Sequence, residues 1–140
     1  MKMEIPPEIK REMMAKYVFL VMTNPTSPEQ EAEYNRWYGT DHYRDVLGVP
    51  GFVAAQRFRL APVQYDKSGP DRSQEAGDVG KHPYKYLSLY EIETDDLASV
   101  FKELKKREAE TWVISDTLDL RDFSTSIFEV IGDKVTAEKR

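Results

Sequence analysis

The chain has 140 residues, which is typical of one domain, and 40% of them are apolar, enough for one hydrophobic core. The net charge of −5 argues against a nucleic acid or an anionic membrane as partner, since both require a basic surface. The absence of cysteine excludes disulfides, thiol nucleophiles and zinc sites built from cysteine. No leader or membrane-spanning pattern is evident, so we expect a soluble, cytoplasmic protein.

The first predicted elements are an arm and a strand. Residues 1–16 contain acids and prolines, and we expect a mobile or loosely docked arm. Residues 17–23 (YVFLVMT) form a short run rich in β-formers that ends at Asn24-Pro25, which predicts a buried strand. We expect a single domain over residues 17–131 and a C-terminal tail over residues 132–140.

A helix is predicted to begin at Ser27. Ser27 can cap the helix, Pro28 fits the first helical position, and Gln30 completes a capping-box pattern. Gly39 weakens the middle of the helix and predicts a local kink. The glycine and proline within residues 48–50 then end it.

The next predicted elements are a strand over residues 51–61 and a long connection over residues 62–83. Alternation along the strand places two sets of side chains on opposite faces: Phe52, Ala54, Gln56, Phe58 and Leu60 on one, and Val53, Ala55, Arg57 and Arg59 on the other. The connection is rich in Gly, Asp, Ser and Pro and too long for a hairpin turn, so we expect an ordered lid or a mobile loop. We expect His82 within it to be solvated.

The second half of the chain repeats the order of strand, helix and strand. Residues 84–93 and 123–131 predict strands, and residues 94–108 predict a helix with acids first and bases last. Two strand–helix–strand units predict an α+β, ferredoxin-like fold, with a four-stranded antiparallel sheet and both helices on one face. The other face carries large apolar residues, so we expect a homodimer formed through the sheet.

The run from the helix into the second strand resembles the signature of the EthD-like family of the dimeric α/β-barrel superfamily. The matching residues are Trp37, Tyr38, Asp41, His42, Asp45, Val46, Leu47, Pro50, Gly51 and Phe52. The resemblance covers residues 17–131 and implies a ferredoxin-like protomer that dimerises through its sheet. That superfamily includes cofactor-independent oxygenases, lactone isomerases, polyketide cyclases and dehydratases. This chain has Tyr43 and Arg44 where the family usually has an aliphatic residue and a proline.

The predicted catalytic residues are His42, Tyr38 and Asp45. A histidine titrates near neutral pH, and Tyr38 and Asp45 lie at helical spacing from it. A carboxylate beside the imidazole would raise its basicity, and a tyrosine hydroxyl could steady a developing oxyanion. The alternative for His42 is a capping or core histidine, and Tyr38 could equally be a partly buried helix aromatic.

The predicted substrate-binding residues come from the helix and from two strands. Trp37 could wall a pocket, although its spacing favours the core, and Asp41 is more typical of a solvated helix residue. Arg57 could hold a carboxylate or an enolate, although an arginine paired with an acid is the more common arrangement. An alternating face of hydroxyl-bearing residues suits a polar cavity or a dimer interface: Tyr86, Ser88 and Tyr90.

These residues predict a cofactor-independent enzyme of isomerase, cyclase, lyase, dehydratase or oxygenase type. Its substrate is expected to be a hydrophobic aromatic or cyclic metabolite, with His42 as the proton shuttle. No cofactor and no metal site are assigned, since the sequence lacks paired histidines on a helix and glycine-rich phosphate loops. The alternatives are a non-catalytic small-molecule binding protein and a structural homodimer.

Overall fold

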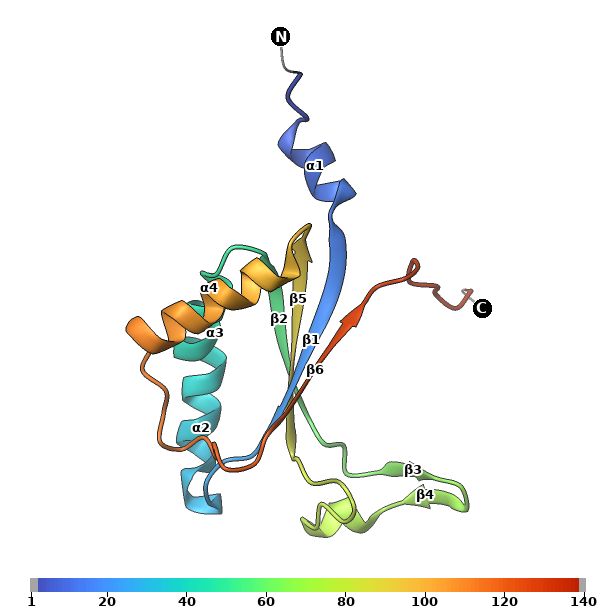
Figure 1. Cartoon of the computed structure of the whole chain (residues 1–140). Coiled ribbons are helices and arrows are strands. Elements are labelled where there is room, and N and C mark those ends of the chain that lie inside the picture. The colour runs from blue at the N-terminus through green and yellow to red at the C-terminus, as the bar shows by residue number, and fades with distance from the viewer. Residues whose placement is uncertain (1–2, 139–140) are drawn as a thin grey trace.

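The computed structural model describes residues 3–138 and contains a four-stranded antiparallel sheet (Figure 1). Its strands are β1 (Ala15–Thr23), β2 (Phe52–Arg59), β5 (Tyr86–Thr94) and β6 (Ser124–Glu129), in the order β2-β5-β1-β6. Each neighbouring pair is antiparallel. The predicted α+β class and four-stranded antiparallel sheet are confirmed, and the arrangement is consistent with a ferredoxin-like fold.

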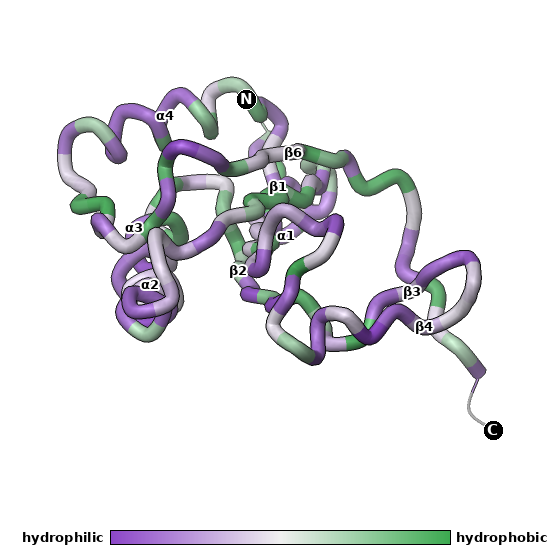
Figure 2. The backbone as a smooth tube through the Cα atoms, turned by 90° about the horizontal axis from the view of Figure 1, so that it is seen from below, coloured by the Kyte–Doolittle hydropathy of each residue, from purple (hydrophilic) through white to green (hydrophobic). Residues whose placement is uncertain are grey.

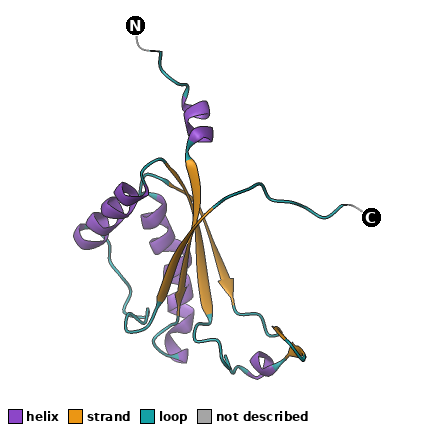
Figure 3. Ribbon diagram, turned by 45° about the vertical axis from the view of Figure 1, so that its right-hand side comes forward, coloured by secondary structure: helices purple, strands orange, loops and turns teal. Residues whose placement is uncertain are grey.

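The main helices lie on one side of this sheet (Figures 1 and 3). The first is one continuous helical segment made of α2 (Glu31–Trp37), a π-helical turn η2 (Tyr38–His42) and α3 (Tyr43–Leu47). The second is α4 (Leu97–Glu110), which begins three residues later than predicted. Asp96 caps α4 by accepting a hydrogen bond from the Ser99 backbone N–H at 3.1 Å. No helix among residues 3–138 is long and apolar enough to span a membrane.

The start of the first helical segment differs from the predicted capping box. A 3₁₀ turn, η1 (Pro28–Gln30), precedes α2, and Ser27 adopts an extended backbone conformation without a capping bond from its side chain. The backbone N–H of Gln30 instead donates to the Ser27 carbonyl at 3.1 Å. The tight 3₁₀ turn therefore supplies the bond that the serine hydroxyl was expected to make.

A short helix, a two-stranded hairpin and a 3₁₀ turn lie outside the sheet and its helices. Helix α1 (Pro7–Met13) falls within the predicted arm and extends from the start of β1 away from the rest of the domain (Figure 1). The long connection contains the hairpin β3 (Gln64–Asp66) and β4 (Gly69–Asp71), followed by a 3₁₀ turn, η3 (Ser73–Ala76). This hairpin lies beyond the end of the sheet that is opposite α1 (Figures 1 and 3).

A β-bulge at the start of β2 changes the predicted faces of that strand. Phe52 pairs with Ile92, and the register then shifts by one residue before Ala54. Phe52 therefore shares the helix-covered face with Ala55 and Arg57, and the prediction that it shares a face with Ala54 is wrong. The bulge adds one residue to one strand only, so strict alternation fails there.

The hydrophobic core fills the space between the sheet and the helices. Its main cluster consists of Val46, Val49, Phe52, Tyr90, Ile92, Val100 and Leu104. Gly51 stands at the entry to β2 with φ +104°, and a Cβ there would lie 2.8 Å from Val100 Cγ2. Glycine is therefore required at this turn by both its backbone conformation and the close approach of α4.

The opposite face of the sheet, here called the open face, carries apolar side chains without a cover. Met22, Phe58 and Phe128 are 38%, 40% and 56% exposed, and they belong to three different strands. Figure 2 shows hydrophobic stretches along β1, whereas the turns of α2 are mostly hydrophilic. An apolar face of this kind is typical of a surface that binds a partner.

Candidate functional site

The π-helical turn η2 gathers the aromatic residues of the predicted site. It contains Gly39, where the sequence predicts a kink, and the irregularity takes the form of one widened turn from Tyr38 to His42. Such turns inside α-helices are often found at functional sites. Here the turn lets Trp37 and Tyr38 both contact the ring of His42.

The imidazole of His42 is enclosed by aromatic rings. It stacks on Trp37 with 4.7 Å between ring centroids, and it meets the edges of Tyr38 at 5.0 Å and Trp112 at 5.8 Å. Its Nδ1 atom is buried and has no hydrogen-bond partner among residues 3–138. Burial lowers the pKa of His42 to about 4, so the ring is neutral at pH 7.

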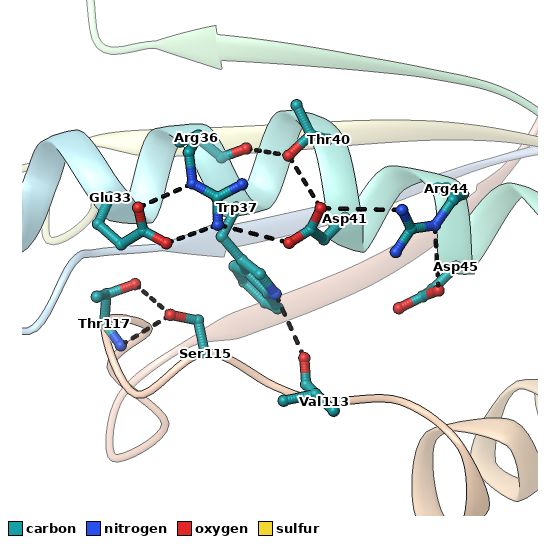
Figure 4. Close-up of polar contacts among 10 residues, drawn as sticks. All are labelled: Glu33, Arg36, Trp37, Thr40, Asp41, Arg44, Asp45, Val113, Ser115 and Thr117. Carbon is teal, nitrogen blue, oxygen red and sulfur yellow. Dashed lines mark hydrogen bonds and ion pairs between the residues drawn. The ribbon is translucent and has the colours of Figure 1, made fainter.

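The two acids of the motif lie apart from this imidazole. Asp45 faces Arg44, with 3.9 Å between Oδ1 and the guanidinium Nε. Asp41 lies 3.5 Å from Arg36 and 3.9 Å from Arg44 (Figure 4). The shift of the His42 pKa is thus opposite to the one expected from a neighbouring carboxylate, because both acids are held on the polar side of the helix.

Trp37 points away from this row of charges (Figure 4). Its side chain is buried, and its indole Nε1 donates to the Val113 carbonyl at 3.3 Å. Ile114 and Leu118 of the same linker pack against the aromatic cluster that contains Trp37. Trp37 therefore ties the helix to the linker that follows α4, and it also forms one wall around His42.

A second part of the site is built around the guanidinium of Arg57 on β2. The guanidinium carbon lies 4.7 Å from the ring centroid of Tyr38, 5.0 Å from that of Tyr86 and 5.2 Å from that of Tyr34. Its Nη1 donates to Asn35 Oδ1 at 2.8 Å. Nε and Nη2 are buried and have no hydrogen-bond partner in the described part of the chain.

No carboxylate is paired with Arg57 within residues 3–138. A buried cation normally pairs with an acid, because its desolvation is unfavourable. The faces of the three tyrosine rings supply part of the compensation through cation–π attraction. The two unpartnered nitrogen atoms nonetheless leave donors that a carboxylate or an enolate oxygen could accept.

A chain of hydrogen bonds fixes the orientation of Arg57. Asn35 accepts from Arg57 through Oδ1 and donates through Nδ2 to the Tyr86 hydroxyl at 3.2 Å. Tyr86 in turn donates to Glu31 Oε2 at 3.0 Å, and Glu31 pairs with Lys85 at 2.8 Å. The Lys85 bond, assisted by Tyr86, lowers the pKa of Glu31 although burial opposes the shift.

Hydroxyl groups from α3 and β5 lie next to the aromatic cage. The Tyr43 hydroxyl donates to Ser88 Oγ at 3.1 Å, and the Tyr90 hydroxyl is buried and unpartnered among residues 3–138. Burial raises the pKa of Tyr43 to about 12, and burial with the nearby hydroxyls of Tyr38 and Tyr43 raises that of Tyr90. These groups are therefore neutral at pH 7 and can serve as hydrogen-bond donors.

The structure thus brings most of the predicted residues together, although not all of them. Seven lie on the helix-covered side of β2 and β5 or on the helix above it: Trp37, Tyr38, His42, Arg57, Tyr86, Ser88 and Tyr90. Tyr38 connects the two parts, since its ring contacts both His42 and the Arg57 guanidinium. Asp41 and Asp45 lie outside this cluster.

The cluster also contains residues that were not predicted as part of the site, among them Tyr34, Asn35, Tyr43 and Trp112. Asn35 precedes Tyr38 by three positions, so helical spacing could have placed it on the same face. Tyr43 stands where the EthD-like pattern usually has an aliphatic residue, and that pattern assigns it no role. Its contact with Ser88 depends on the π-helical turn, which the sequence does not announce.

Two pockets on the surface of the domain are lined by neither His42 nor Tyr90. The space around His42 is instead occupied by side chains of the cluster itself. Trp112, which belongs to the linker after α4, meets the His42 ring edge-on and is only partly buried. Access of a ligand to His42 would therefore require this linker to move.

Comparison with known proteins adds little to this geometry. No family model matches the chain, and no curated protein matches it. Among solved structures, a crystal structure of a putative monooxygenase from Shewanella loihica PV-4 shares 13% identity at a TM-score of 0.49. The match covers 86% of this chain and 99% of that chain. A likeness this distant carries no argument about the function of this chain.

Proposed function

We propose that the chain is a small-molecule enzyme that removes a proton next to a carbonyl group of an aromatic or cyclic hydrophobic substrate. The observation that carries the proposal is the Arg57 guanidinium, whose Nε and Nη2 atoms are buried and have neither a hydrogen-bond partner nor an acid beside them within residues 3–138. A cation held in this way suits a negative charge that forms during the reaction. An enolate oxygen is such a charge, and it is common to isomerisation, cyclisation, elimination and carbanion oxygenation.

In this proposal His42 takes the proton. Its Nδ1 is unpartnered, and its pKa of about 4 keeps the ring neutral, so it can act as an acceptor at pH 7. An anion forming near the imidazole would raise its pKa during the reaction, because the opposite charge favours the protonated ring. Tyr38 contacts both His42 and Arg57, which suits a substrate that spans the two groups.

The hydroxyls of Tyr43, Ser88 and Tyr90 are proposed to orient the substrate. The Tyr90 hydroxyl is buried without a partner in the described part of the chain, so a ligand oxygen could accept its hydrogen bond. Tyr86 and Asn35 act through Arg57, because their hydrogen bonds hold its guanidinium in place. Asp41 and Asp45 are assigned no part in the proton transfer, since they face arginines on the polar side of the helix.

We further propose that the chain is an EthD-like member of the dimeric α/β-barrel superfamily. The motif from Trp37 to Phe52 supports this assignment. The exposed apolar residues of the open face support pairing of two copies through their sheets. Sedimentation of the full chain at micromolar concentration would show a dimer of twice 16.2 kDa if this proposal holds and a monomer if it does not.

A deuterium-exchange assay tests the proposed chemistry without knowledge of the natural substrate. The probe is 2-tetralone, an aromatic ketone with acidic C–H groups next to its carbonyl, and the readout is loss of those proton signals in D₂O by NMR. We expect the protein to accelerate the exchange and His42→Gln to abolish the acceleration. No acceleration by the wild-type protein would contradict proton abstraction from this class of ketone.

A non-catalytic binding protein is the second candidate. The unpartnered nitrogen atoms of Arg57 favour it as well, because a cation that binds an anionic or oxygen-bearing ligand needs no accessible base. Under this alternative 2-naphthol, which mimics the enol of 2-tetralone, would bind with one-to-one stoichiometry, whereas 2-tetralone would exchange no faster than in buffer. The two measurements together therefore separate the candidates.

A further inference from the structure

A pocket at one end of the sheet lies outside the site described above. It has a cavity volume of about 190 Å³ and forms where β2 ends and β5 begins, beside residues 82–84. Met22, Phe58 and Leu87 supply an apolar wall on the open face, where Leu87 pairs with both of the others across the strands. The cluster around His42 lies on the helix-covered face, so the two locations are on different sides of the sheet.

The charged lining of this pocket is entirely basic. The cations Arg59 and Lys85 line it together with His82, and no aspartate or glutamate does. A group of basic side chains stands out in a chain whose net charge is −5. A site that combines an apolar wall with cations and lacks acids favours an organic anion.

The basic groups differ in how far they are already occupied. Lys85 is paired with Glu31, which also attracts Arg59 electrostatically, whereas Arg59 makes no direct hydrogen bond or ion pair within residues 3–138. His82, expected from the sequence to be solvated, is partly buried, and its Nε2 is buried without a hydrogen-bond partner in the described chain. Arg59 and His82 therefore have donor capacity that the protein itself does not use.

A neighbouring pocket provides a contrast. It shares Arg59, Leu60 and Lys85 with the first, but Glu75 and Asp78 also line it. These acids oppose the binding of an anion there by like-charge repulsion. Arg59 lines both pockets, but only the first lacks acids. The first pocket is therefore the better site for an anion.

We propose that this pocket binds a small carboxylate with a single ring or a short apolar chain. The carboxylate lies against Arg59 and His82, and the apolar body lies against Met22, Phe58 and Leu87. The cavity volume of about 190 Å³ is smaller than the roughly 300–1,000 Å³ of pockets for drug-sized ligands. The ligand is therefore restricted to one ring or one short chain beside its carboxylate. The proposal is independent of the reaction proposed for His42 and Arg57, and it requires that pairing through the open face leave Met22 and Phe58, at this end of the sheet, accessible to the ligand.

The test is a titration of the full chain, in its native assembly, with benzoate and with benzamide as its uncharged counterpart. The methyl group of Met22 reports binding at this pocket by NMR, and the indoles of Trp37 and Trp112 report binding near His42. We expect benzoate to shift the Met22 signal to saturation and benzamide to shift it much less. We expect Arg59→Gln to weaken benzoate binding about fivefold, as an ion pair at a partly exposed site would.

Arg72→Gln is the matched control, since Arg72 is exposed on the connection that contains His82, pairs with Glu75 and does not line the pocket. This variant should bind benzoate as the wild-type protein does. Equal shifts with benzamide, or unchanged binding in Arg59→Gln, would overturn the proposal. Shifts confined to the two indoles would also overturn it, while supporting ligand binding at the His42 cluster.

Discussion

The guanidinium of Arg57 lies 4.7 Å from the centroid of the Tyr38 ring, and its Nε and Nη2 atoms have no hydrogen-bond partner within residues 3–138. This contact joins the strand that carries the cation to the helical turn that carries His42. A buried cation held by aromatic faces, with no acid, is unfavourable for folding compared with an apolar side chain of similar size. We interpret it as a group retained for binding.

This interpretation predicts that Arg57 can be replaced without loss of stability. We expect Arg57→Met to leave the free energy of unfolding within about 1 kcal/mol of the wild-type value, or to raise it, because the methionine removes a desolvated charge. Urea denaturation checks this, with Arg57→Lys as a variant that keeps the charge. A decrease of more than about 2 kcal/mol in Arg57→Met would show that the tyrosine cage stabilises the fold through the cation.

The lowered pKa of His42 predicts a dependence of stability on pH. The ordinary pKa of 6.5 applies to the unfolded chain, and the folded value is about 4. As the pH falls below 6.5 the unfolded chain binds a proton that the folded chain does not, so stability present above pH 6.5 is lost between pH 6.5 and 4. The full loss is on the order of 3 kcal/mol.

Carboxylates also titrate in part of this range, so a variant must isolate the histidine. Denaturant unfolding at several pH values between 7 and 4.5 should show a steeper decline for the wild-type protein than for His42→Gln. The difference between the two curves should grow as the pH is lowered. Parallel curves would mean that His42 is accessible to protons in the folded state.

Two glutamates of α2 provide a matched comparison of hydrogen-bonding environments. Glu31 accepts from Lys85 and Tyr86 in a partly buried network, whereas Glu33 makes an exposed pair with Arg36 three residues later. We expect Glu31→Gln to reduce the free energy of unfolding by about 1–3 kcal/mol and Glu33→Gln by less than about 0.5 kcal/mol. Thermal unfolding of both variants compares the two losses of stability. Equal losses would contradict the stabilising role assigned to the hydrogen bonds of Glu31 with Lys85 and Tyr86.

Gly51 and Gly39 should respond differently to alanine. At Gly51 a Cβ meets Val100 at 2.8 Å and φ is +104°, so Gly51→Ala should destabilise the fold by about 1–3 kcal/mol. At Gly39 no heavy atom lies within 4 Å of the added Cβ, so Gly39→Ala should be neutral or stabilising by up to about 1 kcal/mol. Chemical denaturation measures the free energy of unfolding of both variants. An unchanged value for Gly51→Ala would show that α4 can move away from the added Cβ without loss of stability.

The order of the main elements could be predicted because each depends on local patterns. The apolar run of β1, the acids just before α4 and the glycine-proline break after Leu47 all act within a few residues. The faces of β2 were predicted wrongly at Phe52, because a bulge depends on how two distant strands pair. A single extra residue in one strand has no signature in a strictly alternating pattern.

In the candidate site, too, contacts that depend on local spacing could be predicted and contacts that depend on tertiary packing could not. Tyr38 and His42 share a helix turn, so their contact follows from spacing, and the ring contacts agree with it. The placing of Arg57 among three tyrosines combines residues of α2, η2 and β5 and depends on tertiary packing. The direction of the His42 pKa shift could not be predicted either, since burial depends on Trp112, which is 70 residues away in the chain.

The most direct measurement is a titration of the full chain with 2-naphthol, followed through the Nε–H signal of Arg57 by ¹⁵N NMR. The account predicts a saturable shift of that signal, together with shifts of the Trp112 indole, and a loss of binding in Arg57→Met. An Arg57 signal that stays unchanged while 2-naphthol saturates the protein would contradict the account. Equal affinity of the wild-type protein and Arg57→Met would contradict it as well.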